Sequence, residues 1–377
     1  MNLRRTTAIA RKEIIHIIRD PRSLGMALAI PMLLLVLFGY ALSLDVDRIP
    51  TIVWDQDRTP ESRALIARFE GSRYFLVLGF ADHYRPIERA LDRGDALAAL
   101  IVPVNFARKM QNGRPVAVQL LLDGGDSNTA NIAFNFARGL IAAYSAEVRA
   151  EYTIRMGAGE LKPPADARMR VMYNSDLKSR NYIVPGLIAV ILMIVGAMLT
   201  SLAIAREWEN GTMEELLSTP VRPSELVMGK LAAYFLLGLV DMLTAVVAGV
   251  GIFGVPLRGS AWLLFVTGCV FLFGALCWGL LLSAMLRNQL QAFQVSLLTS
   301  FLPAFMLSGF VYAIDNMPLL PRLISYVIPA RYFVSLMKGI FLKDVGLEVL
   351  WLEFALLAIY AAVVFALATR KLREKIA

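Results

Sequence analysis

One short stretch of the sequence concentrates ionisable side chains between two long apolar segments. Residues 205–230, AREWENGTMEELLSTPVRPSELVMGK, carry five carboxylates, three basic residues and two prolines. Carboxylates at this density could act as acids, bases or metal ligands, but those roles need suitable partners. The chain has only two histidines, His16 and His83, and its two cysteines lie in one apolar segment. A metal site is therefore not expected.

Sequence motifs of catalysis are also missing. The chain has no GxxxxGKS/T phosphate loop, no GxGxxG turn, no GxSxG elbow and no HExxH pair. We therefore predict no catalytic residues, no means of hydrolysing ATP and no cofactor bound by this chain. The polar stretch is better interpreted as a contact surface.

Capping and helix-breaking residues predict a definite shape for this stretch. Gly211 permits a turn, and Thr212 with Glu215 forms the T-x-x-E pattern of a capping box at a helix start. Pro220 limits that helix, and Ser224 is suited to cap the next one. Short helices with an acidic face suit docking onto a protein better than onto anionic lipid. The alternative is a solvated loop that only reverses the chain. The predicted docking residues are Glu207, Glu209, Gly211, Thr212, Glu214, Glu215, Leu216, Leu217 and Pro220.

Composition assigns the chain to the membrane. It has 377 residues, of which 57% are hydrophobic, and a mean hydropathy of +0.59, whereas soluble chains are about 45–50% apolar. Six segments approach the roughly 20 residues that a membrane-spanning helix needs. The predicted fold is an α-helical integral membrane protein with a small α/β domain inserted between its first two spans. The expected spans are residues 23–44, 181–205, 230–253, 261–286, 292–313 and 347–369.

Basic residues predict the orientation of these spans. Fourteen Lys and Arg lie on the side of the two termini and of residues 206–229, against five in the short loops on the other side. By the positive-inside rule, both termini are cytoplasmic, including a tail at 370–377, and the even number of spans agrees. The net charge of +8 is explained in this way without a nucleic acid partner.

Residues 1–22 are predicted to form an amphipathic helix on the cytoplasmic face of the membrane. Ala10, Ile14, Ile17 and Ile18 share one face at helical spacing. The alternative is an ordinary basic flank of the first span. Residues 20–21, Asp-Pro, should separate this helix from the span, because the residue before proline disfavours the helical conformation.

Residues 45–180 are predicted to form an extracytoplasmic α/β domain. Runs rich in β-forming residues alternate with helix-like runs from IPTIVW to VAVQLLLDGG, which predicts βα units around a small sheet. This region contains no cysteine, so it must fold without disulfides.

Two polar features lie near or within the spans. Asp241 is the only carboxylate deep inside a span, and a charge there is costly, so it is either functional or held in a packing hydrogen bond. Residues 314–346 are too polar and proline-rich to cross the membrane. We expect two short helices that dip into the outer leaflet as a lid, or else an ordinary external loop.

Three motifs carry a family resemblance that extends over nearly the whole chain. REWENGTMEELLSTPVRPSEL resembles the coupling-helix signature of ABC-2 type permeases, the membrane subunits of ATP-binding-cassette (ABC) exporters. KEIIHIIRDPRSL resembles the amphipathic connecting helix of that family, and IPARYFVSLMKGIFLKD resembles its motif after span five. The chain is most similar to the drug-efflux type of bacterial permease. It departs from the family pattern at Trp208, Lys338 and Asp344.

The resemblance implies one half of an exporter of drugs or other amphipathic compounds in the bacterial inner membrane. Its implied partners are separate ATP-binding cassette subunits, which would hold ATP and Mg²⁺, and a second permease subunit, identical or paralogous. A periplasmic adaptor protein is a further expected partner of the outer domain. The implied connecting-helix residues are Lys12, Glu13, Arg19, Asp20 and Pro21, and the implied lid motif is Pro329, Tyr332 and Phe333.

The resemblance also implies a pathway lined mainly by spans two and five. Side chains there are as well explained by lipid exposure or by helix packing. The candidate pathway residues are Met193, Met198, Phe301, Phe305 and Met306, together with Asp241.

Two other functions remain open from the sequence. An ion-coupled secondary transporter would use Asp241 to bind protons or Na⁺ and should show repeated, interrupted helices, which the sequence does not display. A membrane-anchored sensor would bind a ligand with its outer domain, but it would need a cytoplasmic output domain, and no inner segment exceeds about 25 residues.

Overall fold

The chain forms two compact units, Asp45–Arg170 and the remainder. The computed structural model describes residues 2–42, 48–112, 114–155, 173–174, 178–286 and 288–376. The larger unit is a helical bundle, and the smaller one contains a β-sheet.

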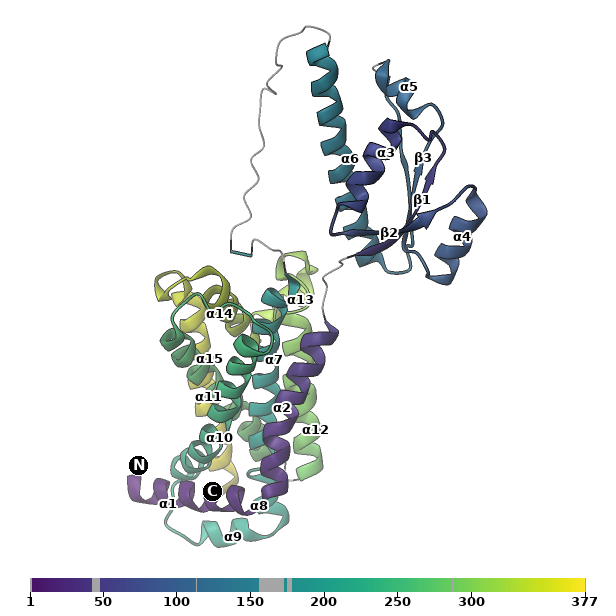
Figure 1. The fold of residues 1–377 in the computed structure, drawn as a ribbon. Helices are drawn as coiled ribbons and strands as arrows, with labels where there is room; N and C mark the ends of the chain where they lie inside the picture. Colours follow the sequence, from purple (N-terminus) through teal and green to yellow (C-terminus); the bar gives the residue numbers. More distant parts are fainter. Residues whose placement is uncertain are drawn as a thin grey trace. The chain divides into compact units, whose positions relative to one another are not determined.

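Among its described residues, the helical unit contains six helices that are long and apolar enough to cross a membrane, and they lie side by side (Figure 1). Helix α7 is at the centre, since 83% of its most apolar window is buried, against 17% of that of α2. Their bounds are α2 Pro21–Ala41, α7 Ser179–Ser201, α10 Pro223–Gly251, α11 Ala261–Met285, α12 Gln289–Leu307 and α15 Leu347–Ile376.

Several of these helices begin or end away from the bounds expected from hydropathy. Helix α10 begins at Pro223 rather than at 230, because Glu225 accepts a hydrogen bond from the backbone N–H of Arg222 and caps its first turn. Helix α12 ends at Leu307 rather than at 313, before Gly309 with its positive φ of 80°. Helix α15 continues through the expected tail to Ile376, with Glu374 paired to Arg370 and Lys371 in its last turns.

Helices α7 and α11 approach each other closely at Gly279. A Cβ atom added there would overlap the carbonyl oxygen of Ala197. Nearby, the Thr200 hydroxyl donates a hydrogen bond of 2.7 Å to the carbonyl of Leu276. Small residues let helix backbones approach within a membrane, where interhelical hydrogen bonds and van der Waals packing drive association.

The shorter helices after α12 are η1 Ile314–Asn316, α13 Leu319–Ser325 and α14 Pro329–Lys343. Helix α14 is part of the bundle core: Pro329 is buried, Phe333 is 1% exposed, and the Phe333 ring stacks on Phe271 at 4.1 Å between centroids. Tyr332 is only partly buried, and its hydroxyl donates to the carbonyl of Tyr326. The residues of the expected lid motif thus form the start of α14, where Pro329 and Phe333 are packed into the bundle.

The smaller unit is a four-stranded sheet with strand order β2-β1-β3-β4, in which only β4 is antiparallel to its neighbour. Successive residues of β3 point to opposite faces, so Ala98 and Leu100 join the core with α3, α5 and α6, while Ala99 and Ile101 pack with α4. The bounds are β1 Ile49–Asp55, α3 Pro60–Glu70, β2 Phe75–Phe80, α4 Tyr84–Arg93, β3 Ala98–Val102, α5 Phe106–Gln111, β4 Gln119–Leu122 and α6 Ser127–Arg155.

The close approach of α7 and α11 predicts that Gly279→Ala destabilises the bundle. Overpacking costs typically about 1–3 kcal/mol, so the melting temperature of the purified protein in detergent should fall. Gly25→Ala in α2 is the matched control, because nothing lies within 4 Å of its added Cβ, and alanine is the better helix former. Equal melting temperatures for the two variants would contradict the predicted contact.

Candidate functional site

The polar stretch folds into two short helices, α8 Ala205–Glu209 and α9 Thr212–Leu217. They lie beside α1, Leu3–Arg19, at the end of the bundle where both chain termini are found (Figure 1). Helix α1 ends before Asp20 and α2 begins at Pro21, as the Asp-Pro pair predicts. Helix α1 crosses the end of the bundle, whereas α2 runs along it.

A serine on another helix holds the start of α8. The Ser283 hydroxyl oxygen on α11 accepts hydrogen bonds of 2.9 Å from the backbone N–H groups of Ile204 and Ala205. These groups have no partner within α8 itself, because the first turn of a helix leaves its N–H groups unsatisfied. Ser283 therefore fixes the turn between α7 and α8 to the bundle.

The predicted capping box at Thr212 and Glu215 is wrong. Gly211, with φ of 72°, occupies the N-cap position, so Thr212 becomes the first helical residue. Its hydroxyl donates to the Glu207 carboxylate instead of capping a backbone group. The predicted cap at Ser224 is also wrong, since α10 begins at Pro223 and Glu225 makes the capping bond.

Four charged residues form an ion cluster that joins α1, α8 and α10. Lys230 on α10 is 2% exposed, and its Nζ lies 2.7 Å from Glu13 Oε1 and 3.1 Å from Glu207 Oε1. Lys12 on α1 is 3.0 Å from the same Glu207 oxygen, but its side chain is 55% exposed. Of the two lysines, only Lys230 is buried, and both carboxylates compensate its charge.

A glycine and a second carboxylate place α1 across α10. A Cβ at Gly229 would lie 2.7 Å from Ile9 of α1, so only glycine lets the two backbones approach this closely. Glu225, which is 1% exposed, accepts a hydrogen bond of 2.6 Å from the backbone N–H of Asn2 and lies 3.9 Å from Arg5. Helix α1 is thus bound to α10 at its start through Glu225 and farther along through the ion cluster.

Glu209 ties α8 to a further helix. Its two carboxylate oxygens accept hydrogen bonds from the backbone N–H and the side-chain amide of Gln289, at 2.8 Å and 2.5 Å. Gln289 is the first residue of α12, so Glu209 satisfies one of the free N–H groups at that helix start. Through Glu207 and Glu209, α8 is bound to α1, α10 and α12. A displacement of α8 would therefore strain its contacts with all three helices.

Fewer of the predicted docking residues are exposed than the sequence suggested. Glu207 and Glu209 bind other parts of this chain and are not free acidic contacts, and Leu216 packs against the internal cluster that contains Met213. Glu214, Glu215 and Pro220 remain exposed on α9 and the turn after it, as does the backbone turn at Gly211. The side chain of Leu217 lies outside the described residues. Arg19 is exposed at the end of α1.

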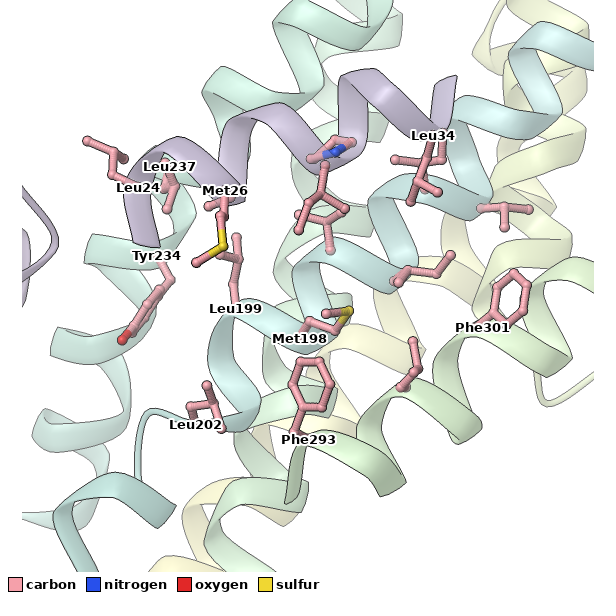
Figure 2. Close-up of a pocket in the computed structure, with 18 of the residues that line it drawn as sticks. Leu24, Met26, Leu34, Met198, Leu199, Leu202, Tyr234, Leu237, Phe293 and Phe301 are labelled. Carbon is pink, nitrogen blue, oxygen red and sulfur yellow. The ribbon is translucent and has the colours of Figure 1, made fainter. Parts of the chain in front are cut away.

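A cavity of about 650 Å³ lies between α2, α7 and α12. Its walls are almost wholly aliphatic and aromatic, and Figure 2 shows Leu24 and Tyr234 at one end, Leu34 and Phe301 at the other, and Met198 between them. Four polar residues line it as well: His16, Asp20, Arg206 and Tyr234.

The structure brings three of the predicted pathway residues together in this cavity, namely Met198, Phe301 and Phe305. Met193 is instead 3% exposed in the core, and Met306 is exposed on α12. The contribution of α2, including Met26 and Pro31, was not predicted, because its apolar sequence looks the same whether it faces lipid or a cavity.

Asp241 does not line the cavity. It is 1% exposed, and neither carboxylate oxygen has a hydrogen-bond partner among the described residues. In the described part of the chain, no group of three His, Cys, Asp or Glu side chains could hold a metal ion.

These features define a multi-pass membrane protein whose helices are joined at one end by a short polar helical segment. Residues 21–370 match the family described as ABC-2 family transporter protein, and the chain belongs to that family. It is 37% identical over 366 residues to the probable multidrug ABC transporter permease YbhS of Escherichia coli K12, covering 97% of this chain and 95% of YbhS. It is 28% identical to YbhR, covering 99% of both chains, and 26% identical to the inner membrane transport permease YhhJ, covering 92% of this chain and 93% of YhhJ, both of Escherichia coli K12.

The buried position of Lys230 predicts that Lys230→Met destabilises the protein strongly. It leaves Glu13 and Glu207 without their buried cation, and breaking a buried pair in this way typically costs about 3–5 kcal/mol. Lys12→Met removes an ion pair with the same carboxylate but on the surface, where the cost is about 0–1 kcal/mol. Thermal unfolding of both variants in detergent measures the difference.

A further substitution separates the ion cluster from simple loss of packing. Adding Glu13→Gln to Lys230→Met removes one uncompensated charge and should recover part of the lost stability. Equal effects of Lys12→Met and Lys230→Met, or no recovery in the double variant, would contradict the role of the cluster.

Proposed function

We propose that this chain is the permease subunit of an ABC exporter that is driven by separate ATPase subunits. The observation that carries this proposal is the contrast between the exposed acids of α9 and the internally bound acids of α8. Helix α9 presents Glu214 and Glu215 to solvent, whereas α8 beside it is bound through Glu207 and Glu209 to α1, α10 and α12. A partner docked on α9 would therefore act on three helices of the bundle at once.

Movement of α9 would pass to the bundle through α8. The ATPase subunits close and open with ATP, and ATP binding can shift the bundle only if the docked states differ in free energy. Because α8 is attached by buried and charged contacts rather than by a flexible link, displacement of α9 would displace the ends of α10 and α12 as well.

The orientation supported by the basic residues places α1, α8, α9 and both termini in the cytoplasm. The α/β unit would then face the periplasm, where an adaptor protein is its expected partner, and the membrane would be the bacterial inner membrane. A second permease subunit, identical or paralogous, would complete the pathway.

The substrate class best supported is amphipathic organic compounds. YbhS and YbhR are named as probable multidrug permeases, and the cavity lined by Met198, Phe301 and Phe305 is apolar enough to accept a drug-sized molecule. Methionine and aromatic side chains adapt to ligands of different shape.

An ion-coupled transporter is the second candidate, and the buried carboxylate of Asp241 favours it. Intramembrane acids without a partner often belong to proton or ion pathways. Transport that persists without any ATPase, and that is abolished by Asp241→Asn, would favour this function over the first.

The docking surface predicts the effect of reversing two charges on α9. Glu214→Lys with Glu215→Lys should prevent the ATPase subunits from co-purifying with the permease and should abolish ATP-driven efflux of a cationic dye from cells. The melting temperature of the permease alone should be unchanged, because both side chains are exposed.

Glu70→Lys with Glu88→Lys is the matched control for this variant. It makes the same change of charge at exposed positions of the α/β unit, and co-purification of the ATPase subunits should persist. Retention of the ATPase by the α9 variant would refute docking at this surface.

A further inference from the structure

The cavity between α2, α7 and α12 has the dimensions of one lipid chain. The residues of α2 that line it run from Leu24, seen at one end in Figure 2, to Phe38, and fourteen residues at a rise of 1.5 Å make roughly 21 Å of helix. The hydrocarbon core of a bilayer is about 30 Å thick, so one leaflet contributes about 15 Å. The cavity is therefore longer than one leaflet is deep, so an acyl chain of leaflet length fits along it.

This cavity also reaches the outer surface of the bundle along α2. Met26 and Ile30 line it and are 56% and 43% exposed. Both residues lie within the apolar window Leu24–Ala41, the part of α2 suited to the membrane interior. A molecule already dissolved in the bilayer could thus enter sideways between α2 and α12, without passing through water.

The polar side chains gather where that leaflet ends. His16 and Asp20 precede the apolar window that begins at Leu24, and Arg206 follows the end of α7 at Ser201. The Arg206 guanidinium nitrogen is 3.4 Å from His16 Nε2. The neighbouring acid Glu207 is bound to Lys230 and Lys12, and Asp20 has an interaction of its own. Arg206 is therefore the cation at this end of the cavity that is best placed to meet a phosphate.

We propose that this cavity binds a phospholipid of the surrounding bilayer, with one acyl chain in the apolar part and its phosphate on Arg206. A guanidinium matches the geometry of phosphate oxygens and forms paired, charge-assisted hydrogen bonds with them. The Tyr234 hydroxyl lies at the same end of the cavity. Arg206, which would bind the phosphate, is adjacent in sequence to Glu207 of the ion cluster. The lipid headgroup would therefore lie at the junction of α1, α7 and α8. The proposal does not depend on what the protein transports.

Photo-crosslinking of the full-length purified protein in phosphatidylcholine nanodiscs tests this site. One probe is phosphatidylglycerol with a diazirine on one acyl chain, and the other is diacylglycerol with the same chain and no phosphate. The readout is the labelling of α7 by mass spectrometry. Helix α7 is largely buried and lines this cavity from Leu187 to Leu199, so label there reports on occupancy rather than on lipid around the protein.

The phospholipid probe should label α7 between Leu187 and Leu202, and diacylglycerol should not. Arg206→Gln should reduce the labelling roughly tenfold, which corresponds to about 1.4 kcal/mol, whereas Arg206→Lys should retain part of it. Arg11→Gln, at an exposed position of α1, should have no effect. Ala27→Phe, which fills the cavity, should abolish labelling, and Ala232→Phe on the exposed face of α10 should not.

Three results would overturn the proposal: equal labelling by the two probes, no labelling of α7 by either, or unchanged labelling in Arg206→Gln. The melting temperature of each variant, measured without probe, separates loss of the site from loss of the fold. If Arg206→Gln and Arg206→Lys both unfold, the comparison of Ala27→Phe with Ala232→Phe decides the question. Loss of labelling in Ala27→Phe alone would then support binding in the cavity, and equal labelling of the two variants would refute it.

Discussion

A buried lysine needs a compensating negative charge, and that requirement organises the end of the bundle where the short helices lie. Lys230 is surrounded by protein, and its ammonium is matched by Glu13 from α1 and Glu207 from α8. Taking an ion out of water costs several kcal/mol, which only close and well-placed partners offset. The two carboxylates can approach Lys230 only if α1 crosses α10 and α8 turns back under the bundle. The charge therefore selects this arrangement of three helices, whatever its net contribution to stability.

The other contacts at this end of the bundle follow from that arrangement. Gly229 gives α1 room to cross, Glu225 binds the start of α1, and Ser283 holds the start of α8. Glu209 extends the connection to α12. Helix α9 carries two exposed acidic residues, Glu214 and Glu215, outside this framework. A segment that is firmly attached on one side and accessible on the other is suited to transmit force from a docked partner.

The sequence predicts the coarse features of this structure because they depend on local composition. Six apolar segments of sufficient length predict six membrane-length helices, and the Asp-Pro pair at 20–21 predicts the break between α1 and α2. The functions of individual glutamates were not predictable in the same way. Glu13 and Lys230 are 217 positions apart in the sequence, and only the crossing of α1 over α10 brings them together. For the same reason, Glu207 and Glu209 looked like surface acids, although the structure binds them internally.

The cavity, too, could be predicted from the sequence only in part. Apolar residues at Met198, Phe301 and Phe305 suggested a pathway, and these three do meet, but the wall formed by α2 is invisible in a sequence where every span is apolar. Capping signals were misleading at Thr212, because a glycine with positive φ one position earlier took the cap and released the threonine hydroxyl to Glu207. Local patterns specify that a helix starts nearby, whereas tertiary contacts decide which residue caps it.

The central claim is that α1 and α8 move as one body because the ion cluster joins them, and that α9 moves with α8 because the Thr212 hydroxyl is bound to Glu207. It can be tested by the distance between spin labels at Thr7→Cys and Ser218→Cys, both exposed, after Cys269 and Cys277 have been replaced by serine. In the proposed complex with ATPase subunits, this distance should be the same with and without ATP, and it should broaden or change with ATP only when Lys230→Met is added. A distance that changes with ATP while the cluster is intact would contradict the claim.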